Sequence, residues 1–138
     1  MGFLRLNELR RLIREELRVA TSVRPMGNKG SGLYAMEFIP AGGLVFQWVD
    51  GYDQAYSLDH PSELSTDERE EFKRLASTDG NAWYLAGGDG AYFNHSSSPN
   101  VRVVKGDGPS ATWDRVAVKD IEPGEELTMD YGEVGIDF

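Results

Sequence analysis

Cysteine is absent from the 138 residues of this chain. Its absence excludes disulfide bonds, zinc sites with cysteine ligands and a thiol nucleophile. Long apolar runs are absent too, because none approaches the ~18 residues that a helix needs to cross a bilayer. No signal-peptide pattern precedes the first charges. We therefore expect a soluble intracellular protein of the cytoplasm or the nucleus, with no membrane partner.

Positive charge is scarce, since 14 Lys and Arg stand against 23 Asp and Glu and give a net charge of −9. An acidic surface repels phosphate, which argues against nucleic acid as a direct ligand, and it attracts lysine-rich segments. The same charge can also serve solubility alone. With 40% hydrophobic residues, a chain of this length is expected to form one compact domain around its own core.

Two segments of the chain predict helices. Apolar residues recur at helical spacing over residues 4–18, with Arg and Glu between them, and this pattern predicts an N-terminal helix. Such a helix can dock on the domain, pair with another copy or bind a different partner. Farther along, Ser65 and Glu68 have the spacing of a capping box. We expect a helix of about ten residues to follow and to end near residues 78–80.

The rest of the chain favours short strands. Residues 33–39 and 44–49 flank a Pro-Ala-Gly-Gly turn and predict a hairpin, whereas residues 52–60 have no clear period and are expected to be loop. Residues 101–105 and 112–119 flank a glycine-rich turn and predict a second hairpin. Further strands are expected at residues 81–86 and 127–131. Because alternating βαβ units are missing, we expect a mostly β fold with short helices rather than a doubly wound nucleotide-binding sheet.

A glycine-rich turn precedes the first of these strands. Gly30, Ser31 and Gly32 lead directly into apolar strand residues. The turn is not a phosphate loop, because no helix follows it and the glycine spacing is wrong. Taken alone, its glycines do no more than permit a positive φ.

Two short polar segments hold the densest sets of hydrogen-bonding groups in the chain. The first, Asn-His-Ser-Ser-Ser-Pro-Asn, occupies residues 94–100, and the second, Gly-Glu-Glu-Leu-Thr-Met-Asp-Tyr-Gly, occupies residues 124–132. Each follows apolar residues, so both are expected at a boundary of the core. On residue type alone, His95 can be a structural histidine, and Tyr131 can be a core tyrosine with a satisfied hydroxyl.

This pair of segments, with the glycine turn ahead of it, resembles the signature of the SET-domain protein lysine methyltransferases, whose members read NHSC-x-PN and then GEELT-x-DYG. Only the cysteine of the first motif is replaced, by Ser97. The resemblance covers residues 27–132 and is to a compact viral or bacterial form without zinc modules. It implies a SET-domain, β-clip-like fold of small sheets with a C-terminal pseudoknot. That domain would span residues 25–138, after an N-terminal helix and linker over residues 1–24.

The resemblance also implies roles for individual residues. S-adenosylmethionine would be the cofactor, and Tyr131 would face the point of methyl transfer as the catalytic residue. No metal is implied. The residues expected along the cofactor are Gly30, Ser31, Gly32, Tyr34, Asn94 and His95.

A substrate channel is expected beside the cofactor. Tyr92, Val116 and Phe138 are the candidates for its walls, and Phe138 or a second copy of the chain would close it. Val116 occupies, by our placement of the motifs, a position where the family often has Phe or Tyr. Its smaller side chain predicts room for di- or trimethylation. Other aromatic candidates for the walls are Trp83, Tyr84, Phe93 and Trp113.

The implied partner is a lysine-containing protein. Histone tails are the usual target of the family and suit an acidic surface, and a homodimer could complete the channel. The alternative function is a non-catalytic SET-like module that binds a basic peptide or protein. A third hypothesis is an adaptor that works through the helix expected over residues 4–18.

Overall fold

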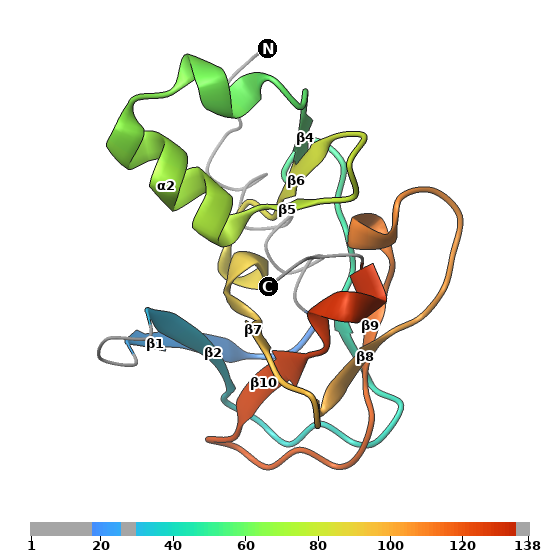
Figure 1. The fold of residues 1–138 in the computed structure, drawn as a ribbon. Helices are drawn as coiled ribbons and strands as arrows, with labels where there is room; N and C mark the ends of the chain where they lie inside the picture. The colour runs from blue at the N-terminus through green and yellow to red at the C-terminus, as the bar shows by residue number, and fades with distance from the viewer. Residues whose placement is uncertain (1–17, 26–29, 135–138) are drawn as a thin grey trace.

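The computed structural model describes residues 18–25 and 30–134 of the chain. The helix expected over residues 4–18 falls almost wholly outside the described residues, as does Phe138. The described part is mostly β, with short strands in three small sheets and one α-helix (Figure 1). This confirms the predicted fold class. No described helix has both the length and the apolar character that crossing a membrane requires.

The first sheet brings the two polar segments together. Its strands are β1 (Thr21–Pro25), β2 (Ser31–Ala35), β10 (Glu126–Met129) and β7 (Asn94–His95), in the spatial order β1-β2-β10-β7. β10 is antiparallel to β2 and parallel to β7. The second polar segment therefore lies between the strand that follows the glycine turn and the start of the first polar segment. The sheet already includes residues 21–24, which the sequence had placed in a linker.

The second sheet contains β3 (Leu44–Phe46), β9 (Arg115–Ala117) and β8 (Val101–Val103), in the order β3-β9-β8. β8 and β9 are antiparallel neighbours, which confirms the hairpin predicted over residues 101–119.

The other predicted hairpin is wrong, because β2 pairs with β1 and β10 whereas β3 pairs with β9. Two longer-range interactions explain the difference. The fully buried Ile39 exchanges backbone hydrogen bonds with the equally buried Ile121, at 2.9 and 2.8 Å. The turn that follows bonds to β9, where the Gly42 amide donates to the Ala117 carbonyl at 2.8 Å. The chain thus leaves the first sheet at Ile39 and enters the second.

The third sheet packs with the helix α2 (Thr66–Leu75) at one end of the molecule (Figure 1). Its strands are β4 (Gln54–Tyr56), β6 (Trp83–Leu85) and β5 (Ser77–Thr78), in the order β4-β6-β5. The loop expected over residues 52–60 is therefore partly strand. The ring of Tyr56 packs against His60 and Phe72. This packing stabilises β4, although the sequence there has no alternating hydrophobic pattern.

The predicted start of α2 is confirmed by a complete capping box. The Glu68 amide donates to the Ser65 hydroxyl, and the Glu68 carboxylate accepts from the Ser65 amide at 3.1 Å. The helix ends at Leu75, before the predicted stop, because the next residues pair with β6. The remaining helical elements are 3₁₀ turns: η2 (His60–Glu63), η3 (Asp89–Tyr92), η4 (Ser110–Thr112) and η5 (Tyr131–Val134).

The core lies between the first two sheets. Its largest fully buried side chains include Leu33 of β2, Phe46 of β3 and Leu127 of β10, with Ile39 and Ile121 beside them. Burying side chains of this size contributes about 1.5–3 kcal/mol each. Leu33 and Leu127 are direct partners across β2 and β10, so the same packing that stabilises the fold sets the position of the second polar segment.

Candidate functional site

Asn94 joins the first polar segment to both the glycine turn and the second segment. Its side-chain amide donates to the Ser31 carbonyl at 3.1 Å and to the Glu126 carboxylate at 2.8 Å. An asparagine amide has two N–H donors, and here both are used. Three segments that are distant in sequence are thereby fixed around one side chain.

Asn100, at the end of the first polar segment, substitutes for a missing strand beside β10. Its side chain is buried, and its amide nitrogen donates to the Glu126 carbonyl at 2.7 Å. Its amide oxygen accepts from the Thr128 amide at 2.9 Å. A side-chain amide offers the same donor and acceptor as a peptide unit, so Asn100 satisfies backbone groups of β10 that would otherwise be buried without partners.

Tyr131 is held at both ends by His95 of the first polar segment and by Phe93, which directly precedes that segment. Its backbone amide donates to His95 Nδ1 at 3.1 Å, and its hydroxyl donates to the Phe93 carbonyl at 2.6 Å. The rings of Tyr131 and His95 lie 5.3 Å apart between centroids. Because Nδ1 of His95 accepts a hydrogen bond, the neutral imidazole carries its proton on Nε2. The predicted convergence of residues 94, 95 and 131 is confirmed.

The Tyr131 phenol is kept in its protonated form. Burial raises the pKa of the Tyr131 hydroxyl above its ordinary value of 10.0, the positive charge of Arg115 lowers it, and the negative charge of Glu126 raises it further. The phenol therefore remains a hydrogen-bond donor throughout the neutral range.

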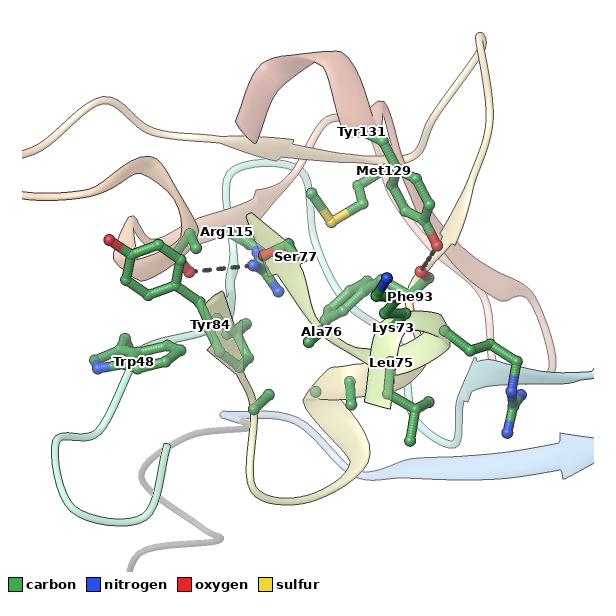
Figure 2. Close-up of a pocket in the computed structure, with 16 residues that line it drawn as sticks. Trp48, Lys73, Leu75, Ala76, Ser77, Tyr84, Phe93, Arg115, Met129 and Tyr131 are labelled. Carbon is green, nitrogen blue, oxygen red and sulfur yellow. Dashed lines mark hydrogen bonds between the residues drawn. The ribbon is translucent and has the colours of Figure 1, made fainter. Parts of the chain in front are cut away.

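Tyr131 lies on the wall of a cavity of about 180 Å³ (Figure 2). Met129 and Tyr131 line one side, and Trp48 and Tyr84 line the opposite side, with Arg115 between the two pairs. The end of α2 and the start of β5 contribute a third wall. The described residues that complete the lining are Phe46, Lys73, Arg74, Leu75, Ala76, Ser77, Ala86, Gly90, Ala91, Phe93 and Ala111.

The charged groups on this lining are all positive. Lys73, Arg74 and Arg115 line the cavity, and no carboxylate of the described residues does. Lys73 and Arg74 are exposed, whereas Arg115 is only 8% exposed. Arg74 is paired with Glu71 at 2.6 Å, and the chain as a whole has a net charge of −9.

The glycine turn lies against the end of α2. Gly30 has a φ of +80°, a conformation that favours glycine, and a Cβ built on it would approach Nη1 of Arg74 to 3.1 Å. Arg74 also forms an ion pair with Glu71 at 2.6 Å. The turn is therefore next to a residue that lines the cavity.

Several residues proposed from sequence are not among the cavity-lining residues: Gly30, Ser31, Gly32, Tyr34, Tyr92, Asn94, His95 and Val116. Tyr34 is on β2 with the Arg24 guanidinium 5.0 Å from its ring centre, and Tyr92 packs against the core. Val116 is paired with Leu44 and Arg102 across the second sheet and is not among the cavity-lining residues. Of the remaining aromatic candidates, Tyr84 and Phe93 line the cavity, and Trp83 and Trp113 are not among its lining residues.

Sequence reasoning missed Trp48, Met129 and Arg115 as cavity residues. A signal was present for two of them. Met129 precedes Tyr131 by two positions, so it belongs to the same short segment as the proposed catalytic residue. Arg115 shares with Ala117 the inward face of β9. Charged residues are uncommon at inward strand positions, so Arg115 was a candidate functional residue. Trp48 carried no signal beyond being aromatic.

Three comparisons with known proteins bear on this site. A family model described as the SET domain matches residues 30–132. Among curated proteins, the histone-lysine N-methyltransferase SETMAR of Mus musculus is 31% identical over 133 residues, which cover 88% of this chain and 43% of SETMAR. The chain thus spans less than half the length of this relative.

Solved structures with the same fold include two histone methyltransferases. The methyltransferase domain of human SETMAR superposes with a TM-score of 0.58 and 24% identity, covering 85% of this chain and 46% of that one. The Neurospora protein DIM-5 superposes with a TM-score of 0.57 and 20% identity, covering 88% and 55%. At these identities the structural likeness establishes the fold.

Proposed function

Since this chain belongs to the SET domain family, we propose that it is a protein-lysine N-methyltransferase that uses S-adenosylmethionine. The observation that supports this most directly is the placement of Tyr131. Its amide is bound to His95, its hydroxyl is bound to the Phe93 carbonyl at 2.6 Å, and its ring lines a cavity. The relative SETMAR is named for the same activity on histone lysines.

The residues around the first sheet fit the proposed cofactor. Gly30 has a φ of +80°, which favours glycine, and Gly32 is buried, so neither residue has a side chain that would keep a ligand from the backbone of this turn. Asn94 ties the turn to β10 through its bonds to the Ser31 carbonyl and the Glu126 carboxylate. We assign the cofactor to Gly30, Ser31, Gly32, Tyr34, Asn94 and His95. The ring of Tyr34 packs against the Arg24 guanidinium, 5.0 Å from its centre.

Held by the glycine turn, Asn94 and His95, S-adenosylmethionine would supply an electrophilic methyl group, and its sulfur would keep the electron pair of the broken bond when the lysine nitrogen takes the methyl. The lysine must offer a lone pair, so the amine has to enter uncharged. Free lysine has a pKa of ~10.4, and neutralising it near pH 7.5 costs roughly 4 kcal/mol. Removal from water favours the uncharged amine.

Tyr131 would orient this amine. Its hydroxyl is already fixed at the cavity wall, so no reorganisation is needed when the substrate arrives, and alignment of reacting groups can supply several kcal/mol. A protonated phenol and the nearby backbone carbonyls would stabilise the charge that moves from sulfur to nitrogen. The methylated ammonium then loses its proton to water.

The substrate we propose is a basic protein segment such as a histone tail. The net charge of −9 would draw such a segment to the surface. A histone target would require access to the nucleus, which cell fractionation tests. Mass spectrometry of the product tests the di- or trimethylation expected from the small side chain of Val116, a residue that does not line the cavity described above. Sedimentation should detect the proposed homodimer.

The decisive experiment incubates the protein with methyl-labelled cofactor, core histones and denatured cell lysate. The wild type should label protein, and Tyr131→Phe should lower the rate about 100-fold or more. Tyr56→Phe is the matched control, because Tyr56 lies in the third sheet, is not one of the residues that line the cavity, and donates its hydroxyl to Gln54 at 2.9 Å. Equal labelling by Tyr131→Phe and the wild type would exclude Tyr131 as the catalytic group.

Calorimetry with S-adenosylmethionine separates this proposal from a non-catalytic module that binds a basic peptide. A folded sample that releases no heat with the cofactor, and that binds a lysine-rich peptide, would favour the module. Saturable cofactor binding at one site per chain is the result expected of the enzyme.

A further inference from the structure

Lys73 is a lysine of the chain itself that lines the cavity of Tyr131. The other two lysines at described positions, Lys105 and Lys119, are exposed and are not among the cavity-lining residues. Lys73 is exposed as well, so it belongs to the open part of the cavity wall. Figure 2 shows it on the side where Phe93 and Tyr131 lie, away from Trp48. An amine therefore stands in the wall of the space where the amine of a substrate is expected.

The packing of α2 holds the backbone of Lys73 against this space. The preceding residue, Phe72, is buried and packs on three other aromatic rings. The Phe72 carbonyl accepts from the Ala76 amide at 2.8 Å, and the chain then pairs with β6. Residues 73–77 consequently form one continuous stretch of the cavity lining. The backbone at Lys73 is fixed, whereas the flexible stem of a lysine lets its amine change position.

The ion pairs of the described residues leave this amine available. The next residue, Arg74, is paired with Glu71 at 2.6 Å. Lys73 forms no ion pair with any carboxylate in the described part of the chain. Its amine can therefore turn into the cavity without breaking an ion pair, and the apolar side chains of Phe93 and Met129 on the lining offer its stem a surface to pack on.

We propose that Lys73 is a methylation site of this chain, modified in cis at the Tyr131 cavity. This inference rests on the proposed methyltransferase function. The neutral Lys73 nitrogen would form a bond to the methyl carbon of the cofactor, the bond from that carbon to sulfur would break, and its electron pair would go to sulfur. The methylated ammonium would then lose its proton to water. Because the amine is tethered beside the reacting groups, it needs no encounter with a second molecule.

The first test incubates the purified protein alone with methyl-labelled cofactor and maps the label by tandem mass spectrometry. Lys73 should carry about tenfold more methyl than Lys105 or Lys119, because only Lys73 is tethered in the cavity. Lys73→Arg should remove most of the label on the chain, and the matched control Lys119→Arg should leave it unchanged. If Lys73→Arg does not fold, the map of the wild type decides.

A mixing experiment tests whether the modification occurs in cis. Wild-type protein is incubated with cofactor and with Tyr131→Phe chains that carry a heavy isotope, so that the two chains differ in mass. Lys73 of the wild type should be methylated, and Lys73 of the heavy chains should not. Methyl-Lys73 on the heavy chains at the wild-type level would overturn the inference, because another copy would then have reached an exposed lysine.

A third readout uses neither the cofactor nor activity. Formaldehyde labelled with an NMR-active isotope, together with a reducing agent, places observable methyl groups on the lysines. The Lys73 signal should differ between the wild type and Tyr131→Phe, and the Lys119 signal should not. A Lys73 signal that is identical in the two proteins would overturn the inference.

The outcomes separate this inference from the proposed function. Label on histones or lysate proteins without methyl-Lys73 would overturn the inference alone. A wild type that labels neither itself nor any added protein would refute the proposed function.

Discussion

The two regions that enclose the cavity are held together by different kinds of interaction. In the first sheet, polar side chains bond to backbone groups of distant strands, as Asn94 does with Ser31 and Asn100 does with Glu126 and Thr128. In the third sheet and α2, aromatic rings pack on one another. Phe72 lies 5.3 Å from Tyr56, 5.1 Å from His60 and 5.6 Å from Trp83, between ring centres.

This difference corresponds to what each region does for the cavity. Hydrogen bonds are directional, so the first region can fix the Tyr131 hydroxyl on one carbonyl oxygen. Ring packing is less directional and tolerates exchange of one apolar shape for another. We infer that the first region sets the geometry of the reaction and the aromatic region supplies a wall whose exact side chains can vary.

Truncating the aromatic region should have the largest effect on stability. Phe72→Ala removes a ring that is 8% exposed and touches three others, so the free energy of unfolding should fall by about 4 kcal/mol. Chemical denaturation measures the loss. Phe72→Leu, which refills most of the space, should lose about 1 kcal/mol. A loss below about 1 kcal/mol in Phe72→Ala would mean that the rings do not hold this region together.

Removing one side-chain amide from the first region should lower the free energy of unfolding nearly as much as Phe72→Ala does. Asn100→Ala leaves the Glu126 carbonyl and the Thr128 amide without their partners at a buried position, and we expect a loss of about 3 kcal/mol in the free energy of unfolding. Unlike Phe72→Ala, it should also weaken cofactor binding in the protein that remains folded, because Glu126 also anchors Asn94.

Asn81→Ala, at an exposed loop position, is the control for Asn100→Ala and should change stability by less than about 0.5 kcal/mol. Asn100→Asp keeps the acceptor for the Thr128 amide and loses the donor to the Glu126 carbonyl. It should therefore fall between the wild type and Asn100→Ala. Unaltered stability in Asn100→Ala would show that water replaces the amide and that the contrast between the two regions is false.

The two regions also differ in how far the sequence predicts them. Asn94, His95 and Tyr131 were singled out because the two segments that contain them resemble the SET-domain signature, and residue type alone left His95 and Tyr131 as structural residues. The structure places His95 and Tyr131 in contact, as expected. The capping box of Ser65 and Glu68 was predicted from the residues themselves, since both of its bonds lie within four residues.

The aromatic wall was much harder to predict. Trp48, two residues after the end of β3, and Tyr84 of β6 meet at 6.3 Å between ring centres, and nothing in their spacing distinguishes them from Trp83 or Trp113. The strand β4 was predicted as loop, because its stability comes from pairing with β6 and from the Tyr56 ring. Contacts that depend on burial between distant segments leave no local pattern, and this also explains the hairpin wrongly predicted around residues 40–43.

The polar capping contact of Ser65, at the start of α2 in the aromatic region, should contribute less to the free energy of unfolding than the contacts of Asn100. Ser65→Ala removes the N-cap of α2, and the free energy of unfolding should fall by about 1 kcal/mol. In Ser65→Gly the free energy of unfolding should fall by only about 0.3 kcal/mol, because glycine is tolerated at the N-cap position. A Ser65→Ala loss equal to that of Asn100→Ala would show that directional bonds support both regions alike.

The smallest expected effect is on the pH dependence of the free energy of unfolding in alkaline solution. It is measured for one tyrosine from each region. Burial is the largest cause that raises the pKa of Tyr131 and of Tyr84, and Asp79 adds to the rise at Tyr84. Unfolded phenols ionise near pH ~10. The folded phenols ionise at higher pH, so their contribution to stability is complete below pH ~10 and is lost as pH rises through the folded pKa values.

The measurement is the slope of the unfolding free energy between pH ~9 and ~11, relative to that of the wild type. Tyr131→Phe and Tyr84→Phe should each make the decline shallower, and the double variant should be the shallowest. Tyr131 differs in that its hydroxyl makes a 2.6 Å bond to a carbonyl, whereas Tyr84 reaches Asp79 at 3.4 Å. Tyr131→Phe should therefore also lower stability at neutral pH by about 1 kcal/mol, and Tyr84→Phe by less. If both variants keep the wild-type slope, neither phenol is protected from ionisation, and the Tyr131 hydroxyl is not held as a donor in the way that the proposed reaction requires.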